Sequence, residues 1–429
     1  GISEESVSVV HVRNRTEELE FVGFNNFNLD TTEIFESFVK IINDECGGFH
    51  GRSLRLEEVE VSAFDAFGVS IESLSTAACL AASQEIPSVI VFDPLGLSGP
   101  LADCVTNLNK TALITSKSIS EKLLEESNKR IILDSFTTEE AFSLMINFAE
   151  LSGLLVEKSI AIVADNNRSN YQSIISVLRE GLQKLGYNPD FYVIDCENGI
   201  FCTEGTSSIM EALLQDPPDI LFPTLNVFSL PEFIFKMVEN GIPKPQIIQS
   251  GFNFQDMEIA TRHLLDYGGM EIAEYYDGTI IVSHRPENIH LTNDYEPSSF
   301  DKMCLLEYSR ASNIDQHLYD SRAKEIVVRI CSHLRYAARA IYDSGLNPSR
   351  RTIHESFSNL GQVDSPGMIP GSFKPGKLTR PDTIRSMRYN YPCEYENLTP
   401  ENLGEGCIMS DTAEQNLLIF KAEFHNKDL

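Results

Sequence analysis

The chain has 429 residues and a formal net charge of −29, because 63 Asp and Glu outnumber 34 Lys and Arg. Such a surface repels phosphate backbones, which argues against a nucleic-acid partner. Hydrophobic residues make up 42% of the chain, and no apolar run reaches the roughly 18 residues of a membrane helix, so a globular protein of several domains is expected. The first residues lack the basic start and apolar core of a signal peptide.

At the N-terminal end, apolar segments alternate with amphipathic helical patterns. The alternating residues 7–12 predict an edge strand, and 34–42 predict a helix preceded by Asp30 and Glu33 at capping-box spacing. Further strands are predicted at 19–24, 54–61, 89–92, 111–115 and 131–133, and further helices at 71–83 and 138–151.

The stretch from Ser159 to Gly186 shows the repeating unit most clearly. Residues 160–164 are all apolar, 165–170 form a polar turn, and 171–185 carry the apolar face of a helix. A strand that is apolar on both faces is typical of a parallel sheet covered by helices on both sides. The same pattern predicts strands at 191–194, 220–223, 246–249 and 279–282, and helices at 207–214 and 231–240. The remaining predicted elements are long helices at 323–343 and 348–360 and a strand at 384–389.

Strands separated by helices in this way predict right-handed βαβ units, and therefore an α/β protein built from doubly wound parallel sheets. The polar turns after such strands lie at the carboxyl edge of a sheet, where open α/β folds bind ligands. We expect two lobes, with a first crossing near Asp134 and a return near Thr279.

Several stretches resemble the type I periplasmic binding proteins, in particular the leucine/isoleucine/valine-binding branch that serves ABC importers. Residues 43–52 are similar to the family's helix end, with paired glycines and a third Gly before the second strand. Residues 154–282 resemble the family's second lobe, and 337–345, followed by Arg350-Arg351, resemble a later helix and its continuation. The resemblance covers nearly the whole chain in the same order.

The resemblance implies two doubly wound parallel-sheet lobes joined by a three-segment hinge. Lobe I is expected at 1–134 plus 283–355, and lobe II at 135–282 plus 356–429, with the third segment near 356–364. A ligand would be held at the strand ends by hydroxyls, backbone N–H groups and helix N-termini. No cofactor and no metal are implied.

The resemblance also implies which residues would contact the ligand. In lobe I these are Phe24, Asn25, Ser98, Gly99, Thr115, Ser116 and Ser118, and in lobe II they are Tyr171, Asn226, Phe228 and Asn253. The alternative for the hydroxyl residues is that they only cap helices. The alternative for Tyr171 is packing at a helix start.

The turn after the fourth strand of lobe II departs from the amino-acid-binding pattern. Relatives commonly carry a carboxylate there to pair with the ligand ammonium, whereas this chain has Ser250-Gly251-Phe252-Asn253. The first acid is Asp256, which we expect to cap a helix. A buried ammonium without a carboxylate is poorly compensated, so a neutral or acidic ligand is as plausible as an amino acid.

Nine cysteines fit an exported protein that contains disulfides. The resemblance implies a bridge between Cys79 and Cys104. The predicted pairs are Cys79–Cys104, Cys196–Cys202, Cys304–Cys331 and Cys393–Cys407, with Cys46 free. The alternative is that these residues are buried free thiols.

The enzyme motifs that were sought are absent from the sequence. There is no H-E-x-x-H, no G-x-S-x-G, no Walker loop and no G-x-G-x-x-G, and His50, His263, His284, His333 and His354 are scattered. We therefore expect no enzyme. An enzyme on a doubly wound fold is the third hypothesis.

The first hypothesis is an extracytoplasmic solute-binding protein, in the periplasm or at the cell surface, with or without a lipid anchor. It would be a monomer that captures a small polar molecule, an amino acid or a related carboxylate or amide, by hinge closure. It would then deliver the molecule to an ABC permease in the membrane. The alternative is the ligand-sensing ectodomain of a receptor with the same fold.

Overall fold

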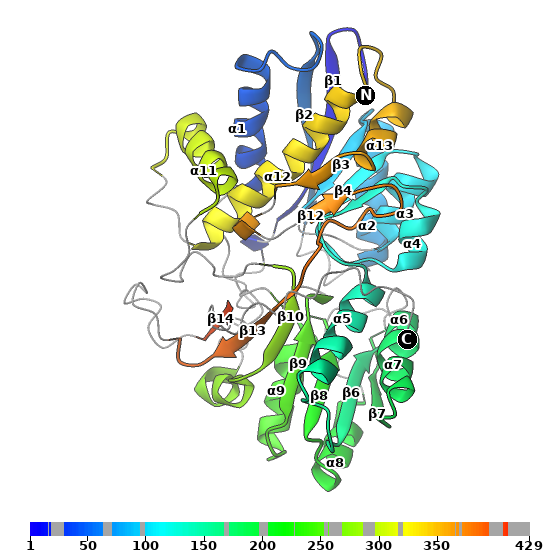
Figure 1. Cartoon of the computed structure of the whole chain (residues 1–429), viewed down its shortest axis with the longest axis vertical. Coiled ribbons are helices and arrows are strands. Elements are labelled where there is room, and N and C mark those ends of the chain that lie inside the picture. Colours follow the sequence, from blue (N-terminus) through cyan, green and yellow to red (C-terminus); the bar gives the residue numbers. More distant parts are fainter. Residues whose placement is uncertain are drawn as a thin grey trace.

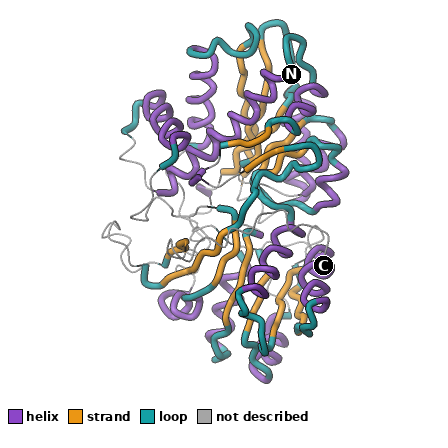
Figure 2. Tube along the Cα trace, viewed as in Figure 1, coloured by secondary structure: helices purple, strands orange, loops and turns teal. Residues whose placement is uncertain are grey.

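The computed structural model shows two bodies stacked along the long axis of the molecule, each with a central sheet flanked by helices (Figures 1 and 2). The structure describes residues 1–15, 17–18, 30–62, 71–94, 99–166, 171–196, 205–226, 228–252, 256, 268–285, 297–315, 321–364, 366–368, 371–393 and 406–410. Four of the predicted ligand contacts, Phe24, Asn25, Ser98 and Asn253, lie outside these residues. Within the described part of the chain, no helix is both long and apolar enough to span a membrane.

The first sheet has five parallel strands in the order β2-β1-β3-β4-β5. The strands are β1 (Ser6–Arg15), β2 (Ser53–Ser62), β3 (Ile90–Asp93), β4 (Ala112–Thr115) and β5 (Ile131–Leu133). The prediction that 7–12 form an edge strand was wrong, because β1 lies between β2 and β3. Val7, Val9, Val10 and Val12 pack into cores on both faces, and the polar residues between them concealed this from the sequence. The strand predicted at 19–24 falls outside the described residues.

Helices cover both faces of this sheet. They are α1 (Thr31–Asp44), α2 (Ile71–Leu80), α3 (Gly99–Asp103), α4 (Glu121–Glu126), α11 (Ser299–Ser312), α12 (Ser321–Asp343) and α13 (Arg350–Phe357). The side chain of Asp30 accepts a hydrogen bond from the N–H of Thr32 and so caps α1, as the sequence indicated. One core lies beneath α1, α11, α12 and α13, and a second lies beneath α2 and α3.

The second sheet has seven strands in the order β14-β13-β10-β9-β8-β6-β7. Its parallel strands are β6 (Ile160–Asp165), β7 (Asp190–Ile194), β8 (Ile220–Thr224), β9 (Gln246–Ser250) and β10 (Ile280–Ser283), and the antiparallel ones are β13 (Arg385–Asn390) and β14 (Cys407–Ser410). Its helices include α5 (Thr138–Leu151), α6 (Tyr171–Ser173), α7 (Glu180–Lys184), α8 (Thr206–Gln215) and α9 (Ser229–Glu239). Apolar cores lie on both faces, as a doubly wound sheet requires.

The chain passes between the two sheets three times, and these passages are called crossings below. The first is 134–137, between β5 and α5, and the second connects β10 to α11 and includes the described residues His284 and Arg285. The third follows β12 (Gly371–Phe373), which pairs with β11 (Gly361–Val363), and leads into β13. Val363 and Phe373 pack into the core beneath the first sheet. The expected lobe limits remain a prediction, and this packing favours a third crossing after Phe373 over one near 356–364.

Candidate functional site

The carboxyl ends of the parallel strands in both sheets face the region where the three crossings lie. β5 ends at Leu133 and opens the first crossing, and β10 ends at Ser283 and opens the second. All strands of the first sheet run parallel to β5, and β6 to β9 run parallel to β10, so the carboxyl ends of these strands face the same region (Figure 1). Open α/β sheets bind ligands at such turns.

The predicted hydroxyl residues after β4 differ in what they contact. The Oγ1 of Thr115 accepts a hydrogen bond from the N–H of Lys117 at 3.2 Å. Ser116 is buried, with its Oγ 3.4 Å from His333 Nε2 and its carbonyl 3.1 Å from a guanidinium nitrogen of Arg285. Ser118 lines a small cavity, and Gly99 begins α3 after β3. Their roles in ligand binding stay predictions.

In the second lobe, the predicted contacts lie at helix starts. Tyr171 begins α6, and its ring centroid is 6.4 Å from that of Phe191. The Oδ1 of Asn226 accepts hydrogen bonds from the N–H groups of Phe228 and Ser229, each at 3.0 Å. Asn226 thereby caps backbone N–H groups at the start of α9. Capping does not decide whether it also contacts a ligand, which stays a prediction.

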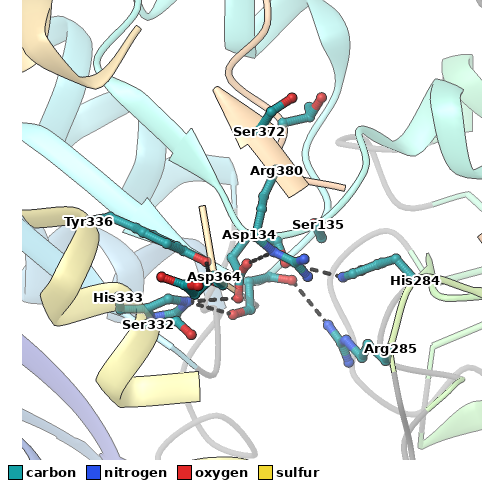
Figure 3. A network of polar contacts seen from close by, with 12 residues as sticks. Asp134, Ser135, His284, Arg285, Ser332, His333, Tyr336, Asp364, Ser372 and Arg380 are labelled. Atoms are coloured by element: carbon teal, nitrogen blue, oxygen red, sulfur yellow. Dashed lines mark hydrogen bonds and ion pairs between the residues drawn. The ribbon is translucent and has the colours of Figure 1, made fainter. Parts of the chain in front are cut away.

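Asp134, which is buried in the first crossing, contacts residues of the other two crossings through its carboxylate and its backbone carbonyl (Figure 3). Its Oδ2 accepts a hydrogen bond from His333 Nε2 at 2.9 Å, and its Oδ1 pairs with Arg380 of the third crossing. Its backbone carbonyl accepts a hydrogen bond from His284 Nε2, in the second crossing, at 3.1 Å. Asp134, His284, His333 and Arg380 are called the hinge network below.

Backbone pairing brings these side chains together. The N–H of Leu133 donates to the carbonyl of Leu378 at 2.9 Å, and the N–H of Arg380 donates to the carbonyl of Leu133 at 2.8 Å. The third crossing is thereby fixed along the end of β5, one residue before Asp134. α12 supplies His333 from the core side.

Burial and neighbouring charges set the protonation states of Asp134 and His284 in the hinge network. Burial alone would raise the pKa of Asp134, but the charge of Arg380 and the hydrogen bond from His333 outweigh it and hold that pKa well below its usual value. Burial, with the charges of Arg380 and Arg285, lowers the pKa of His284 well below 6.5. Asp134 is therefore ionised and His284 is neutral near pH 7.

A second buried ion pair lies beside the hinge network. A guanidinium nitrogen of Arg285 is 3.1 Å from Asp256 Oδ1, and the other carboxylate oxygen accepts a hydrogen bond from Ser283. Asp256 was expected to cap a helix; its neighbours 253–255 and 257–267 lie outside the described residues, so that expectation stays a prediction. The cavity beside the ion pair, lined by residues such as Ser118, Phe136 and His284, has room for about one water molecule.

A third polar cluster lies between α4 and α5 and is called the acidic junction, made of Glu121, Glu139 and Glu140. Glu139 accepts hydrogen bonds from the N–H of Glu121 at 2.8 Å and from the hydroxyl of Ser173 at 2.6 Å. Glu140 completes the capping box of α5 with Thr137. Burial, followed by the charges of Glu139, Glu140 and Glu125, raises the pKa of Glu121 to about 7.

Sequence reasoning missed the residues of the hinge network. His284 and His333 were noted only as scattered histidines, and Asp134 only as marking the first crossing. No spacing in the sequence links residues 134, 284, 333 and 380, because their contact depends on tertiary packing. The described residues include no group of three or more His, Cys, Asp or Glu placed to hold a metal ion.

Three of the four predicted disulfides are confirmed. They are Cys79–Cys104, Cys304–Cys331 and Cys393–Cys407, and Cys46 is an exposed free cysteine, also as predicted. Cys196 is disulfide-bonded, while its predicted partner Cys202 lies outside the described residues.

No protein-family model matches the chain, and no curated protein matches its sequence. Solved structures match nearly its whole length. A fatty acid ABC transporter substrate-binding protein from Thermomonospora curvata gives a TM-score of 0.63 at 12% identity, covering 99% of this chain and 95% of that one. A solute binding protein of an ABC transporter from Rhodopseudomonas palustris HaA2, in complex with p-hydroxybenzoic acid, gives 0.63 at 11% identity, with 97% and 98% covered. The leucine binding protein LivK from Thermotoga maritima gives 0.62 at 12% identity, with 92% and 100% covered.

Identities this low carry information about the fold alone. The likeness extends over almost the full length of the chain, and therefore over both sheets and the crossings between them. The chain has the fold of the type I periplasmic binding proteins, in which two doubly wound α/β lobes are joined by a three-segment hinge.

Proposed function

We propose that this protein is a solute-binding protein that captures a small polar molecule between its two lobes. The observation that carries the proposal is the arrangement of the sheets, whose carboxyl ends share the region of the three crossings. Open α/β sheets bind ligands beyond the carboxyl ends of their strands, which supports a binding region shared by the two lobes. The solved structures named above are solute-binding and substrate-binding proteins, which supports the same role here.

Capture would proceed by closure of the lobes. A ligand stabilises the closed form only through contacts that it makes with both lobes in that form. The predicted contacts lie on both sides, with Thr115 and Ser118 after β4 in the first lobe and Tyr171 and Asn226 after β6 and β8 in the second. The hinge network supplies a buried, charge-compensated pivot between them.

The ligand that we propose is a neutral or acidic small molecule, such as a small carboxylate or amide. Asp256 is the first acid after β9, and its carboxylate is already paired with Arg285 and Ser283. A ligand ammonium would have to compete with that guanidinium for the carboxylate, in a site where unpaired buried charge is costly. An amino acid is therefore the less favoured ligand.

Delivery to an ABC permease from an extracytoplasmic compartment follows from the proposed role. The three disulfides fit an oxidising compartment. We propose that the protein acts as a monomer, that it does not catalyse a reaction on its ligand, and that it binds no nucleic acid, because its net charge is −29.

The proposal is tested by identifying a ligand and then removing one of its predicted contacts. Small molecules that co-purify with the protein are identified by mass spectrometry after denaturation. If none is recovered, p-hydroxybenzoate, leucine and a fatty acid serve as probes in titration calorimetry. Binding should contract the protein in small-angle X-ray scattering. We expect Tyr171→Ala to weaken binding by about tenfold or more, as loss of an aromatic contact usually does.

The control is Tyr342→Ala, which removes an exposed tyrosine near the end of α12. Its affinity should equal that of the unmodified protein. Saturable binding without contraction would contradict capture between lobes. Failure of every co-purified molecule and probe to bind would contradict the proposed function itself.

A further inference from the structure

Arg285, in the second crossing, contacts groups that belong to both lobes. One terminal nitrogen of its guanidinium is 3.1 Å from Asp256 Oδ1, and the other is 3.1 Å from the carbonyl oxygen of Ser116. Ser116 follows β4 of the first sheet directly. Asp256 accepts a hydrogen bond from Ser283 at the end of β10, which fixes it to the second sheet.

This contact is built from buried groups. The relative exposure of Arg285 is 3%, that of Ser116 is 1% and that of Asp256 is 0%. The backbone of the second lobe also makes room for the carboxylate, because a Cβ on Gly251 would lie 2.7 Å from Asp256 Oδ2 and 3.1 Å from Ser283 Oγ. A larger residue at 251 would displace the acceptor that holds the guanidinium.

The planar fork of an arginine suits this position, because it can donate from two nitrogens to two acceptors at a fixed separation. A lysine ammonium could neutralise Asp256, but its single nitrogen would not reach both acceptors in the same way. A lysine at position 285 would therefore keep a positive charge beside the Asp256 carboxylate but lose the hydrogen bond to the Ser116 carbonyl.

The geometry points to Arg285 as a positioning residue that holds the Ser116–Ser118 segment against the second lobe and so sets how far the ligand-binding region opens. That the Ser116–Ser118 segment binds ligand rests on the proposed function. The contact that Arg285 makes between the lobes is independent of it and can be tested on the ligand-free protein.

The test is hydrogen–deuterium exchange of Arg285→Lys, followed by mass spectrometry of peptides covering 112–119 and 246–252. We expect exchange in both peptides to become about tenfold faster, the change produced by losing one hydrogen bond from a charged donor. Thermal unfolding of this variant should remain cooperative, since a positive charge still faces Asp256. The radius of gyration from X-ray scattering should change in the same variant.

The matched control is Arg350→Lys. The guanidinium of Arg350 also donates to two backbone carbonyls, those of Ser88 and Asn109, but both belong to the first lobe. Its replacement should leave exchange in 246–252 and the radius of gyration unchanged. Faster exchange confined to 246–252 in Arg285→Lys, or the same response in both variants, would overturn the inference.

A milder variant keeps the inference falsifiable if Arg285→Lys does not fold. Ser283→Ala removes the hydroxyl that donates to Asp256 and accepts from the N–H of Arg285 at 3.1 Å. Exchange should then increase in both peptides by a smaller factor. An increase on the second-lobe side alone would again overturn the inference. In either variant, intact ligand binding without faster exchange in both peptides would refute the inference and leave the proposed function standing.

Discussion

The hinge network and the acidic junction both lie where the lobes meet, and their surroundings shift the pKa of a carboxyl group in opposite directions. In the hinge network the carboxylate of Asp134 faces Arg380 and His333, and its pKa is held low. In the acidic junction Glu121 faces further carboxylates, and its pKa is raised to about 7. Asp134 of the first cluster therefore stays ionised at neutral pH, whereas Glu121 of the second changes its charge in the neutral range.

The largest expected effect on the free energy of unfolding comes from removing the carboxylate of the hinge network. Asp134→Asn removes the carboxylate from the buried charge of Arg380 and should lower the free energy of unfolding by about 3–5 kcal/mol. Urea unfolding at pH 7 measures the loss. The control is Glu355→Gln, which breaks an exposed pair with Arg351 on α13 and should change nothing measurable. A loss in Asp134→Asn no larger than in the control would show that the network does not stabilise the fold.

A smaller effect on the free energy of unfolding, which depends on pH, is expected in the acidic junction. Folded Glu121 keeps its proton up to about pH 7, while the unfolded chain releases it near the ordinary value of 4.5. The free energy of unfolding should therefore fall as pH rises between these values. Glu121→Gln should remove this trend and stabilise the protein at pH 8 by about 1–2 kcal/mol, after allowance for solvent screening.

The groups around Glu121 define the control for that experiment. Glu125 lies on the same helix, Glu139 and Glu140 lie on α5, and Lys377 of the third crossing faces Glu140. Glu126→Gln alters a carboxylate on α4 that pairs with Lys122 and is absent from this set. Its unfolding curves should keep the pH trend of the unmodified protein between pH 5 and 8. A trend that survives Glu121→Gln would assign the titration to another group.

The two clusters also show what a sequence can and cannot predict. Buried strands such as β6 were predictable because every residue from Ile160 to Ala164 is apolar, and α1 because Asp30 precedes an amphipathic pattern. Such signals are local. β1 was misjudged because His11 and Ser8 interrupt its valines, although His11 is fully buried and its ring packs 4.4 Å from that of Phe35.

The candidate site depends on contacts between residues far apart in the chain. The Cys79–Cys104 disulfide was predictable through the resemblance, and Cys304–Cys331 and Cys393–Cys407 were predictable from their places along the chain. The approach of Arg380 to Asp134, in contrast, requires the third crossing to pair with Leu133. No pattern of residue types near position 380 indicates that pairing. Likewise, the sequence marks Ser116 as a hydroxyl after a strand but cannot show that its carbonyl is held by Arg285.

The smallest expected effect comes from removing one hydrogen bond of the acidic junction, the bond from Ser173 to Glu139. Ser173 belongs to α6 of the second lobe and donates to Glu139, which also accepts from the N–H of Glu121 in the first lobe. Ser173→Ala should cost about 1 kcal/mol, the usual value of one such hydrogen bond, because Glu139 keeps its backbone donor. Ser176→Ala is the control, since that hydroxyl donates only to the carbonyl of Gln172 within its own helix. If the junction joins the lobes, Ser173→Ala should also make the amides of 121–126 exchange faster. Unchanged exchange there would confine the effect of Ser173 to the second lobe.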